Sequence, residues 1–215
     1  GEDCDVTIVA GCGIHNGGDQ KSQHDGIHSF YVGKNAKLKY VEKHYGEGEG
    51  TGERILNPET IVELGEGAYM EMETVQIRGV DSTVRKTRAK LDKDATLVIH
   101  EKIMTHGRQY AKTDFAVEMD GEGSSVNLVS RSVARDESKQ EFVSVINGNN
   151  RCAGHSECDG IIMEHLHGQE GFVRVMRHPV GRGKGQNDLT RTVAAGTAGA
   201  GKPHQRPVAE PPQLA

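Results

Sequence analysis

Apolar residues recur at every second position in five stretches of the chain. The pairs are Leu38 and Tyr40, Met70 and Met72, Leu97 and Ile99, Val117 and Met119, and Val126 and Leu128. Successive side chains of a β-strand point to opposite faces of a sheet, so each pair lies on one face of a strand. The pattern therefore predicts strands with one buried face and one exposed face.

These strands belong to a repeat in which a polar or glycine-containing turn leads, often through a small residue, into the alternating positions. The five segments are "VGKNAKLKYV" (32–41), "LGEGAYMEME" (64–73), "LDKDATLVIH" (91–100), "MDGEGSSVNLV" (119–129) and "INGNNRCAGH" (146–155). Their markers Gly33, Gly65, Asp92, Gly121 and Gly148 are separated by 32, 27, 29 and 27 residues. The longest step contains "YGEGEGTGER" (45–54), which we interpret as an inserted loop.

Most of these units contain a second predicted strand, for example "STVRKTRAKL" (82–91) and "KQEFVSVI" (139–146). A β-sandwich built from hairpins places turn signals about 8–12 residues apart, and the repeat here is nearly three times as long. A solenoid fits the spacing better, because each repeat then forms one coil of two or three strands that pair in parallel with the next coil. The sequence favours this all-β solenoid, with the sandwich as the alternative.

The composition agrees with a chain of strands and tight turns. Only 34% of the residues are hydrophobic and 4% aromatic, whereas 28 are glycine. No stretch approaches the roughly 20 consecutive apolar residues of a membrane span, and no signal peptide opens the chain, so we expect no membrane partner. Because the chain starts at Gly1 and enters strand-like sequence at once, we interpret it as a fragment without its N-terminal part.

Composition divides the chain near residue 165. The alternation stops at about Leu166, and five of the six prolines follow residue 178. Residues 166–215 are rich in Gly, Pro and Ala, and such a segment buries too little apolar surface to offset its ordering entropy. We therefore predict a β-solenoid core over residues 1–165 and a disordered tail over 166–215.

Charge and cysteine usage narrow the partners and the compartment. Residues 166–215 hold seven Lys and Arg against three Asp and Glu, a balance of +4, so residues 1–165 carry −9 within the total of −5. An acidic body lacks the clustered cations that neutralise phosphates, which argues against a nucleic-acid partner. The four unevenly spaced cysteines do not resemble a secreted disulfide framework, so we expect a reducing, cytoplasmic location.

The segment "RCAGHSECDGIIM" (151–163) gathers the most reactive side chains, among them Cys158. Cations, histidines or backbone N–H groups raise the thiolate fraction of a cysteine, and thiolate is the form that accepts sulfur or binds iron. Arg151, His155 and Glu157 are therefore candidate neighbours for the thiols. In strand geometry, however, Cys152 and Cys158 share one face, while His155 and Glu157 point to the other.

Each cysteine also has a structural interpretation, as a small buried apolar residue. The C-x5-C spacing of Cys152 and Cys158 is weak support for zinc, because structural zinc sites use two close pairs. Cys12, in "AGCGIHNGG" (10–18), lies among glycines that let another backbone approach closely. We rank Cys158 and Cys12 above Cys4 and Cys152 as functional candidates.

Other candidate motifs are weaker. His24 and His28 share a strand face, and we interpret them as exposed polar residues rather than metal ligands. Glu71 and Glu73 fit a solvated strand face better than an acid/base pair, which leaves a carbohydrate-active β-helix enzyme as a minor alternative. The sequence contains no G-x-S-x-G, no phosphate-binding glycine loop and no H-E-x-x-H.

Three long segments resemble the SufB/SufD family of iron–sulfur cluster assembly proteins. They are "AGCGIHNGGDQKSQHDGIHSFYVGKNAKLKYVEKHYGEGEGTGERILNP", "SSVNLVSRSVARDESKQEFVSVINGNN" and "CAGHSECDGIIM", within residues 5–164. The resemblance implies a right-handed parallel β-helix core. It also implies a SufB/SufD-type partner chain in a dimer, the ATPase SufC, and a cysteine desulfurase that supplies persulfide sulfur.

The resemblance assigns chemistry to two cysteines. Cys158 matches a SufB cysteine that is a proposed ligand of sulfur or of the transient iron–sulfur cluster, and Cys12 falls where SufB has a cysteine thought to receive sulfur. SufD typically lacks the cysteine matched by Cys158, so the chain is more similar to SufB. In the family a further β-helix stretch, a "HEA" motif and helices that dock SufC follow, and none is recognisable in 166–215, which resembles a replaced or out-of-frame end.

We therefore expect a cluster assembly scaffold without turnover chemistry of its own. Cys158 would be the metal ligand and Cys12 a second sulfur site, and partners would perform desulfuration and ATP hydrolysis. The alternative is a non-catalytic β-solenoid interaction protein, a degenerate or truncated relative of SufB and SufD.

Overall fold

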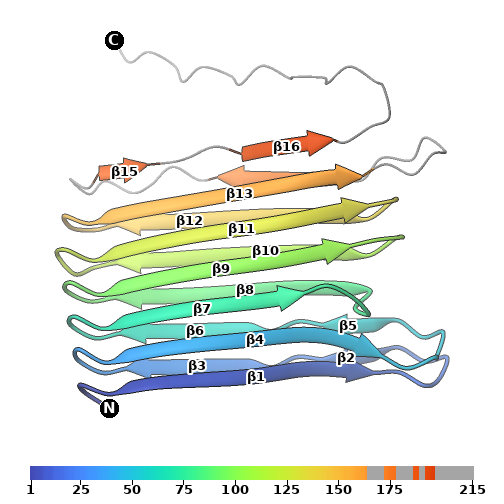
Figure 1. Ribbon diagram of the computed structural model, residues 1–215, viewed down its shortest axis with the longest axis horizontal. Helices are drawn as coiled ribbons and strands as arrows, with labels where there is room; N and C mark the ends of the chain where they lie inside the picture. The colour runs from blue at the N-terminus through green and yellow to red at the C-terminus, as the bar shows by residue number, and fades with distance from the viewer. Residues whose placement is uncertain (164–171, 178–185, 189–191, 197–215) are drawn as a thin grey trace, which may run out of the picture.

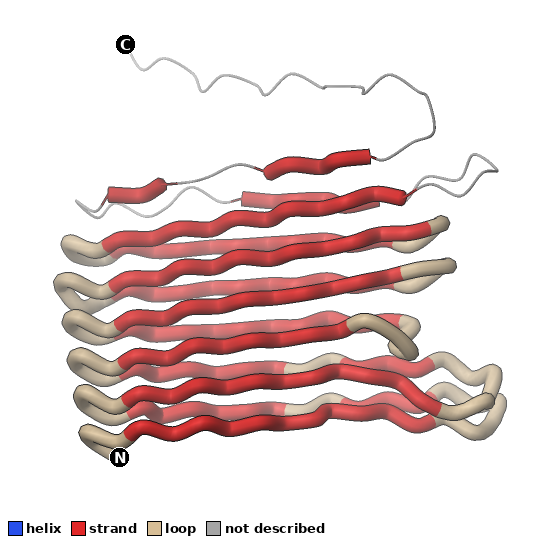
Figure 2. Tube along the Cα trace, in the orientation of Figure 1, coloured by secondary structure: helices blue, strands red, loops and turns tan. Residues whose placement is uncertain are grey.

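The computed structural model describes residues 1–163, 172–177, 186–188 and 192–196. These residues form strands and turns without any helix, and therefore without a helix able to span a membrane. The chain winds into stacked coils, and each coil contributes to two sheets that lie face to face (Figure 1). Figure 2 shows that turns and loops close the coils at both ends of the strands.

One sheet contains the strand that opens each coil. Its strands are β1 (Asp5–His15), β4 (Lys37–Glu47), β7 (Tyr69–Gln76), β9 (Thr96–Thr105), β11 (Ser125–Arg135), β13 (Ala153–Met163), β15 (Gln186–Asp188) and β16 (Thr192–Gly196). The order is β1-β4-β7-β9-β11-β13-β15, with β16 also paired to β13, and every pairing is parallel. We call this sheet A.

The return strands form the second sheet, sheet B. They are β2 (Ser22–His24), β3 (Ile27–Val32), β5 (Arg54–Leu56), β6 (Glu59–Leu64), β8 (Ser82–Leu91), β10 (Tyr110–Met119), β12 (Lys139–Gly148) and β14 (Phe172–Arg177). In the first two coils the return strand is interrupted, giving β2 and β3, then β5 and β6. From β8 onward it is continuous, and again all pairings are parallel.

The parallel pairings confirm the solenoid and exclude the sandwich of antiparallel hairpins. Successive partners at one position of sheet A are Asp5, Lys37, Tyr69, Thr96, Ser125 and Ala153. The first two steps span 32 residues each and the later ones 27 to 29, close to the spacing of the sequence repeat. The predicted insertion at 45–54 is also present, because residues 48–53 form a loop between β4 and β5.

The turn before each sheet A strand explains the repeat. Its third residue has a positive φ, with values of 53° at Asn35, 66° at Gly67, 55° at Asp94 and 77° at Gly123. Glycine adopts this conformation without steric cost, and Asn and Asp tolerate it best among the others. A small side chain follows and is buried, for example Ala95, which is fully inaccessible. Stacked turns then bond to one another, as when the N–H of Asn35 donates to the carbonyl of Glu66.

The space between the sheets is divided along the length of the strands. The first half of each sheet A strand contributes an apolar column, such as Leu38, Met70, Leu97 and Val126, which are paired in register. The second half contributes mostly polar buried side chains, and Cys12 and Ile14 at this end form a small apolar cluster with Leu56 and Val80. The core is thus apolar at one end of the coils and largely polar at the other, and this second half contains the candidate chemistry.

Three described segments lie within the predicted tail. Residues 172–177, 186–188 and 192–196 form strands that pair with β12 and β13, so at these positions the coil stack continues beyond residue 165. The rest of the predicted disordered tail lies outside the described residues.

Substitution of Gly46 tests the close stacking of the coils. A Cβ added at Gly46 would overlap the carbonyl oxygen of Gly79 in the next coil, and the N–H of Gly46 donates to the neighbouring carbonyl of Arg78, which holds the two backbones together. We expect Gly46→Ala to lower the free energy of unfolding by about 1–3 kcal/mol, measured by urea denaturation. In Gly11→Ala, the matched control, the new methyl group would meet only the Tyr45 ring, at 3.7 Å. Equal denaturation midpoints for the two variants would contradict the close approach.

Candidate functional site

The two predicted sulfur sites lie on the same face of sheet A. Cys12 on β1 and Cys158 on β13 both point into the space between the sheets and are 8% and 1% exposed. β1 and β13 are five strand steps apart, which corresponds to roughly 24 Å at the usual spacing (Figure 1). The two thiols therefore occupy separate sites within one interior.

A column of polar side chains runs between these sites. The residues paired in register with Cys158 are, in successive strands toward β1, Ser130, Glu101, Thr74, Glu42 and Ala10. The neighbouring inward column contains Cys12, His44, Gln76, Ile103 and Ser132. Because the strands are parallel and in register, equivalent positions stack directly. We call these two neighbouring columns together the polar column, although Ala10 and Ile103 within them are apolar.

Cys12 lies beside an acidic residue and a histidine of the next strand. Its Sγ, a carboxylate oxygen of Glu42 and a ring nitrogen of His44 all lie within 4.8 Å of one another, and all three side chains are buried. Oε1 of Glu42 is 3.2 Å from Nε2 of His44 and 3.2 Å from Nδ1 of His28. His28 in turn contacts the Tyr40 hydroxyl at 2.9 Å.

Burial sets the protonation of this cluster. Burial, followed by the charge of Glu42, raises the pKa of the Cys12 thiol. Burial alone would raise the pKa of the Glu42 carboxyl, but the nearby histidines, chiefly His44, outweigh it and hold this pKa below its usual value. Burial also lowers the pKa of His44, and Glu42 only partly opposes that effect. These shifts favour the protonated thiol at Cys12, the carboxylate at Glu42 and the neutral ring at His44.

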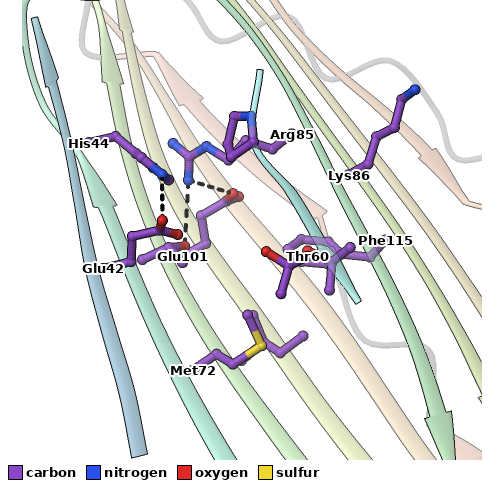
Figure 3. A pocket seen from close by; sticks show the side chains of 12 residues that line it. Glu42, His44, Thr60, Met72, Arg85, Lys86, Glu101 and Phe115 are labelled. Atoms are coloured by element: carbon purple, nitrogen blue, oxygen red, sulfur yellow. Dashed lines mark hydrogen bonds and ion pairs between the residues drawn. The ribbon is translucent and has the colours of Figure 1, made fainter. Parts of the chain in front are cut away.

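A buried ion pair occupies the middle of the polar column. Nη1 of Arg85, on β8, lies 3.4 Å from Oε1 of Glu101 (Figure 3). Nη2 of Arg85 donates to Oε1 of Gln76 at 3.0 Å. Glu101 also accepts hydrogen bonds from the hydroxyls of Thr113 at 2.9 Å and Ser130 at 2.7 Å. Burial lowers the pKa of Arg85, but a guanidinium remains charged in proteins. The carboxylate is therefore paired and hydrogen-bonded, as a buried charge requires.

Two small cavities lie beside the ion pair. The first, of about 10 Å³, is lined by Glu42, His44, Arg85 and Glu101 among others (Figure 3). The second, also of about 10 Å³, is lined by Glu101, Ser130 and Cys158 among others. Each has room for about one water molecule or small ion. Glu101 lines both cavities, and Cys158 lines the second, whereas Cys12 lines neither.

The predicted neighbours of Cys158 lie elsewhere. His155 and Glu157 are on the outer face of β13, where Nε2 of His155 is 3.4 Å from Oε2 of Glu157. Arg131 binds Glu157 at 2.7 Å on that surface, and Arg151 is exposed in the turn before β13. The alternation of faces expected from the sequence is thus present. The structure does not bring these three side chains into the cavity beside Cys158.

The other sequence interpretations have mixed outcomes. Glu71 and Glu73 lie on the outer face and bind the lysines Lys39 and Lys102, each at 3.0 Å, as a solvated face does. His24 is exposed as predicted. The interpretation of His28 as an exposed polar residue is wrong, because it is partly buried against Tyr40 and Glu42.

Sequence reasoning missed Glu42, His44, Arg85 and Glu101, although a signal was present. Glu42 and His44 continue the inward positions of Leu38 and Tyr40, and Glu101 continues that of Ile99. A charged residue at an inward position of a strand must find a partner inside the protein. Which partner it finds depends on the register between coils, which the sequence alone does not give.

Removing the carboxylate of the Arg85–Glu101 ion pair tests whether the pair is buried. We expect Glu101→Gln to lower the free energy of unfolding by about 3–5 kcal/mol, because Arg85 then lacks its paired carboxylate. The double variant Arg85→Met, Glu101→Met should recover much of this loss. As a control, Glu73→Gln breaks the surface pair with Lys102 and should change stability by less than about 1 kcal/mol. Similar losses in the two glutamate variants, measured by urea denaturation, would contradict a buried pair.

Comparison with known proteins agrees with this fold. The family model described as SUF system FeS cluster assembly, SufBD core domain, matches residues 14–175, a range that contains Cys158, begins two residues after Cys12 and ends within β14. An iron–sulfur cluster assembly SufBD family protein of Archaeoglobus fulgidus is 25% identical over 162 residues, which cover 75% of this chain and 42% of the relative.

Two other SufBD family proteins of this kind are similar. That of Methanocaldococcus jannaschii is 28% identical over 163 residues, covering 75% of this chain and 50% of the relative. That of Methanothermobacter thermautotrophicus strain Winter is 26% identical over 167 residues, which cover 75% of this chain and 39% of the relative. The chain thus spans half or less of the length of these relatives. Since the family model covers most of the chain, the predicted relationship is confirmed, and the chain belongs to the SufBD family of SUF-system iron–sulfur cluster assembly proteins.

Proposed function

We propose that this chain is a scaffold component for iron–sulfur cluster assembly, in which Cys12 accepts sulfur and Cys158 binds iron or sulfide of the nascent cluster. Family membership supports the general role. The observation that supports the residue assignment is the polar column, because both thiols belong to it and the cavity beside Cys158 has room for about one ion. A purely structural solenoid core would be expected to fill these inward positions with apolar side chains.

Sulfur enters at Cys12 by transfer from a persulfide donor. The Cys12 thiolate attacks the outer sulfur of the donor, a new S–S bond forms at Cys12, and the donor leaves as a thiol with no net oxidation. Because burial raises the pKa of the Cys12 thiol, a base has to take its proton. We assign this role to the imidazole of His44, which has a ring nitrogen within 4.8 Å of the sulfur.

Cys158 has surroundings suited to a small inorganic ion. The cavity beside it, lined also by Ser130, Ser132 and Glu101, offers hydroxyl and carboxylate oxygens but no room for an assembled cluster. We therefore assign Cys158 the first iron or sulfide, with the cluster growing as a neighbouring coil or chain moves aside. The cluster is cargo in this scheme, and the scaffold performs no turnover.

The partners follow from the same proposal. A cysteine desulfurase system supplies the persulfide, a SufC-type ATPase supplies the work of ATP hydrolysis, and a second SufB/SufD-type chain supplies the remaining cluster ligands. A reducing compartment such as the cytoplasm suits thiols that have to stay reactive.

Substitution of Cys158 tests the cluster site. After anaerobic reconstitution with ferrous iron and sulfide, we expect Cys158→Ser to lose most of the bound iron and sulfide, because a serine hydroxyl does not replace a thiolate toward iron. Serine is close in size, and hydroxyls of Ser130 and Ser132 already line the cavity, so the circular dichroism spectrum should be unchanged. The control is Cys152→Ser, at a buried turn position. If the unsubstituted chain, Cys158→Ser and Cys152→Ser bound equal amounts of iron and sulfide, the result would favour the alternative function, a non-catalytic β-solenoid interaction protein.

A trapping experiment tests the sulfur acceptor. After incubation with a persulfide-loaded cysteine desulfurase, alkylation and peptide mass spectrometry should find a persulfide on Cys12. The rate should rise with pH, since the pKa of this buried thiol is raised and its thiolate is the nucleophile. Cys4→Ser, which removes a partly buried thiol on the same coil, should leave the labelling intact. Labelling confined to Cys158 would remove Cys12 from the scheme.

A further inference from the structure

The cluster around Cys12 contains three kinds of metal-ligating atom. A thiol sulfur, a carboxylate oxygen and an imidazole nitrogen lie within 4.8 Å of one another on Cys12, Glu42 and His44. All three side chains come from inward positions of two adjacent strands, β1 and β4, so paired backbones hold them in place. In the described part of the chain, no other group of three His, Cys, Asp or Glu side chains converges in this way.

Two of these side chains lack hydrogen-bond partners despite their burial. Among the described residues, neither ring nitrogen of His44 makes a hydrogen bond, and Oε1 of Glu42 makes none either. Their contact at 3.2 Å has the distance of an ion pair but not the geometry of a hydrogen bond. The side chains of both residues are only 1% exposed. A buried polar atom without a partner is costly, so this cluster is incomplete without a ligand.

The charged groups around Glu42 indicate that the missing ligand is a cation. Arg85 is already paired with Glu101, so the nearest groups to the Glu42 carboxyl are the rings of His28 and His44, each at 3.2 Å. A divalent cation bound by a carboxylate and a thiolate would form a neutral group. The contact of His28 with Glu42 leaves both ring nitrogens of His44 without hydrogen-bond partners, whereas a metal ion would engage one of them.

The ligand set selects the class of metal. Sulfur, nitrogen and carboxylate oxygen together suit borderline transition metals such as Zn²⁺ and Fe²⁺, whereas Mg²⁺ and Ca²⁺ prefer oxygen alone. Tetrahedral bond lengths of about 2.3 Å to sulfur and about 2.0 Å to nitrogen put two such ligand atoms about 3.5 Å apart. Since the three atoms lie within 4.8 Å of one another, a closure of at most about 1.3 Å completes the site.

We propose that Cys12, Glu42 and His44 bind one divalent transition-metal ion of the Zn²⁺ or Fe²⁺ class inside the first two coils, separate from the cluster site at Cys158. Three protein ligands leave a fourth position for solvent or an incoming sulfur atom. The bound ion holds Cys12 as a thiolate and blocks the sulfur that would attack a persulfide. The metal ion and persulfide sulfur consequently compete for Cys12. This competition rests on the proposed function, in which Cys12 accepts sulfur, whereas the metal site itself does not.

Cobalt titration of the reduced, metal-free chain tests the site. With Co²⁺ as the probe under anaerobic conditions, we expect thiolate-to-cobalt charge-transfer absorption that saturates at one equivalent. Cys12→Ser should abolish this absorption, and Glu42→Gln should raise the dissociation constant by more than about tenfold, since even loss of an outer hydrogen-bond partner of a metal ligand costs 10–100-fold. Cys152→Ser is the control and should bind Co²⁺ as the parent does. Competition by Fe²⁺ or Zn²⁺ then identifies the preferred ion.

A second measurement uses the unsubstituted protein and does not depend on variants that fold. Zn²⁺ or Fe²⁺ should slow alkylation of Cys12 by more than tenfold and leave that of Cys4 unchanged, as read by peptide mass spectrometry. Absence of the cobalt absorption, its survival in Cys12→Ser, or its loss only in Cys158→Ser would each overturn the proposal. None of these outcomes decides whether Cys158 loads a cluster, so the metal site and the proposed function fail separately.

Discussion

The in-register parallel stacking of coils is the constraint on which the rest of this structure depends. Each inward position lies directly above and below its equivalents, about 4.8 Å away, so neighbouring coils have to agree in size and polarity. The turns satisfy this rule with a positive φ at the same position, supplied by Asn35, Gly67, Asp94 and Gly123 in successive coils. The apolar half of the interior satisfies it with columns of aliphatic side chains. The polar half satisfies it through contacts between coils.

In the polar half, a buried charge is paired with residues of a neighbouring coil, because its own coil provides no buried partner of opposite charge. Glu101 on β9 is paired with Arg85 from the opposite sheet and bonded by Ser130 from the next coil. Replacing such a group by an apolar residue of similar volume often stabilises a protein, so stability alone does not explain a buried ion pair. The polar half is better explained by chemistry that requires oxygen, nitrogen and sulfur atoms inside the solenoid.

The sequence predicts the fold more completely than the site. Alternation such as that of Leu97 and Ile99, together with a repeat near 30 residues, was enough to predict a parallel solenoid, because both features follow from local geometry. Cys12 and Cys158 were ranked first from their neighbours in sequence and given roles by the resemblance, and their inward direction agrees with strand parity. The roles given to Arg151, His155 and Glu157 came from closeness in sequence, which on a strand puts alternate side chains on opposite faces. The real neighbours of each thiol are one coil away, about 27 to 32 residues along the chain.

The two thiols differ in ways that suit different tasks. Cys158 is 1% exposed and paired in register with Ser130, next to a cavity whose carboxylate is already neutralised by Arg85. Cys12 is more accessible and lies beside Glu42, whose nearest partners are the rings of His28 and His44 and not a guanidinium. An acidic neighbour makes a poor activator for a thiol but a good partner for a cation. A metal ion at Cys12 would thus supply the thiolate that the protein surroundings alone disfavour, and its release would expose that thiolate to a sulfur donor.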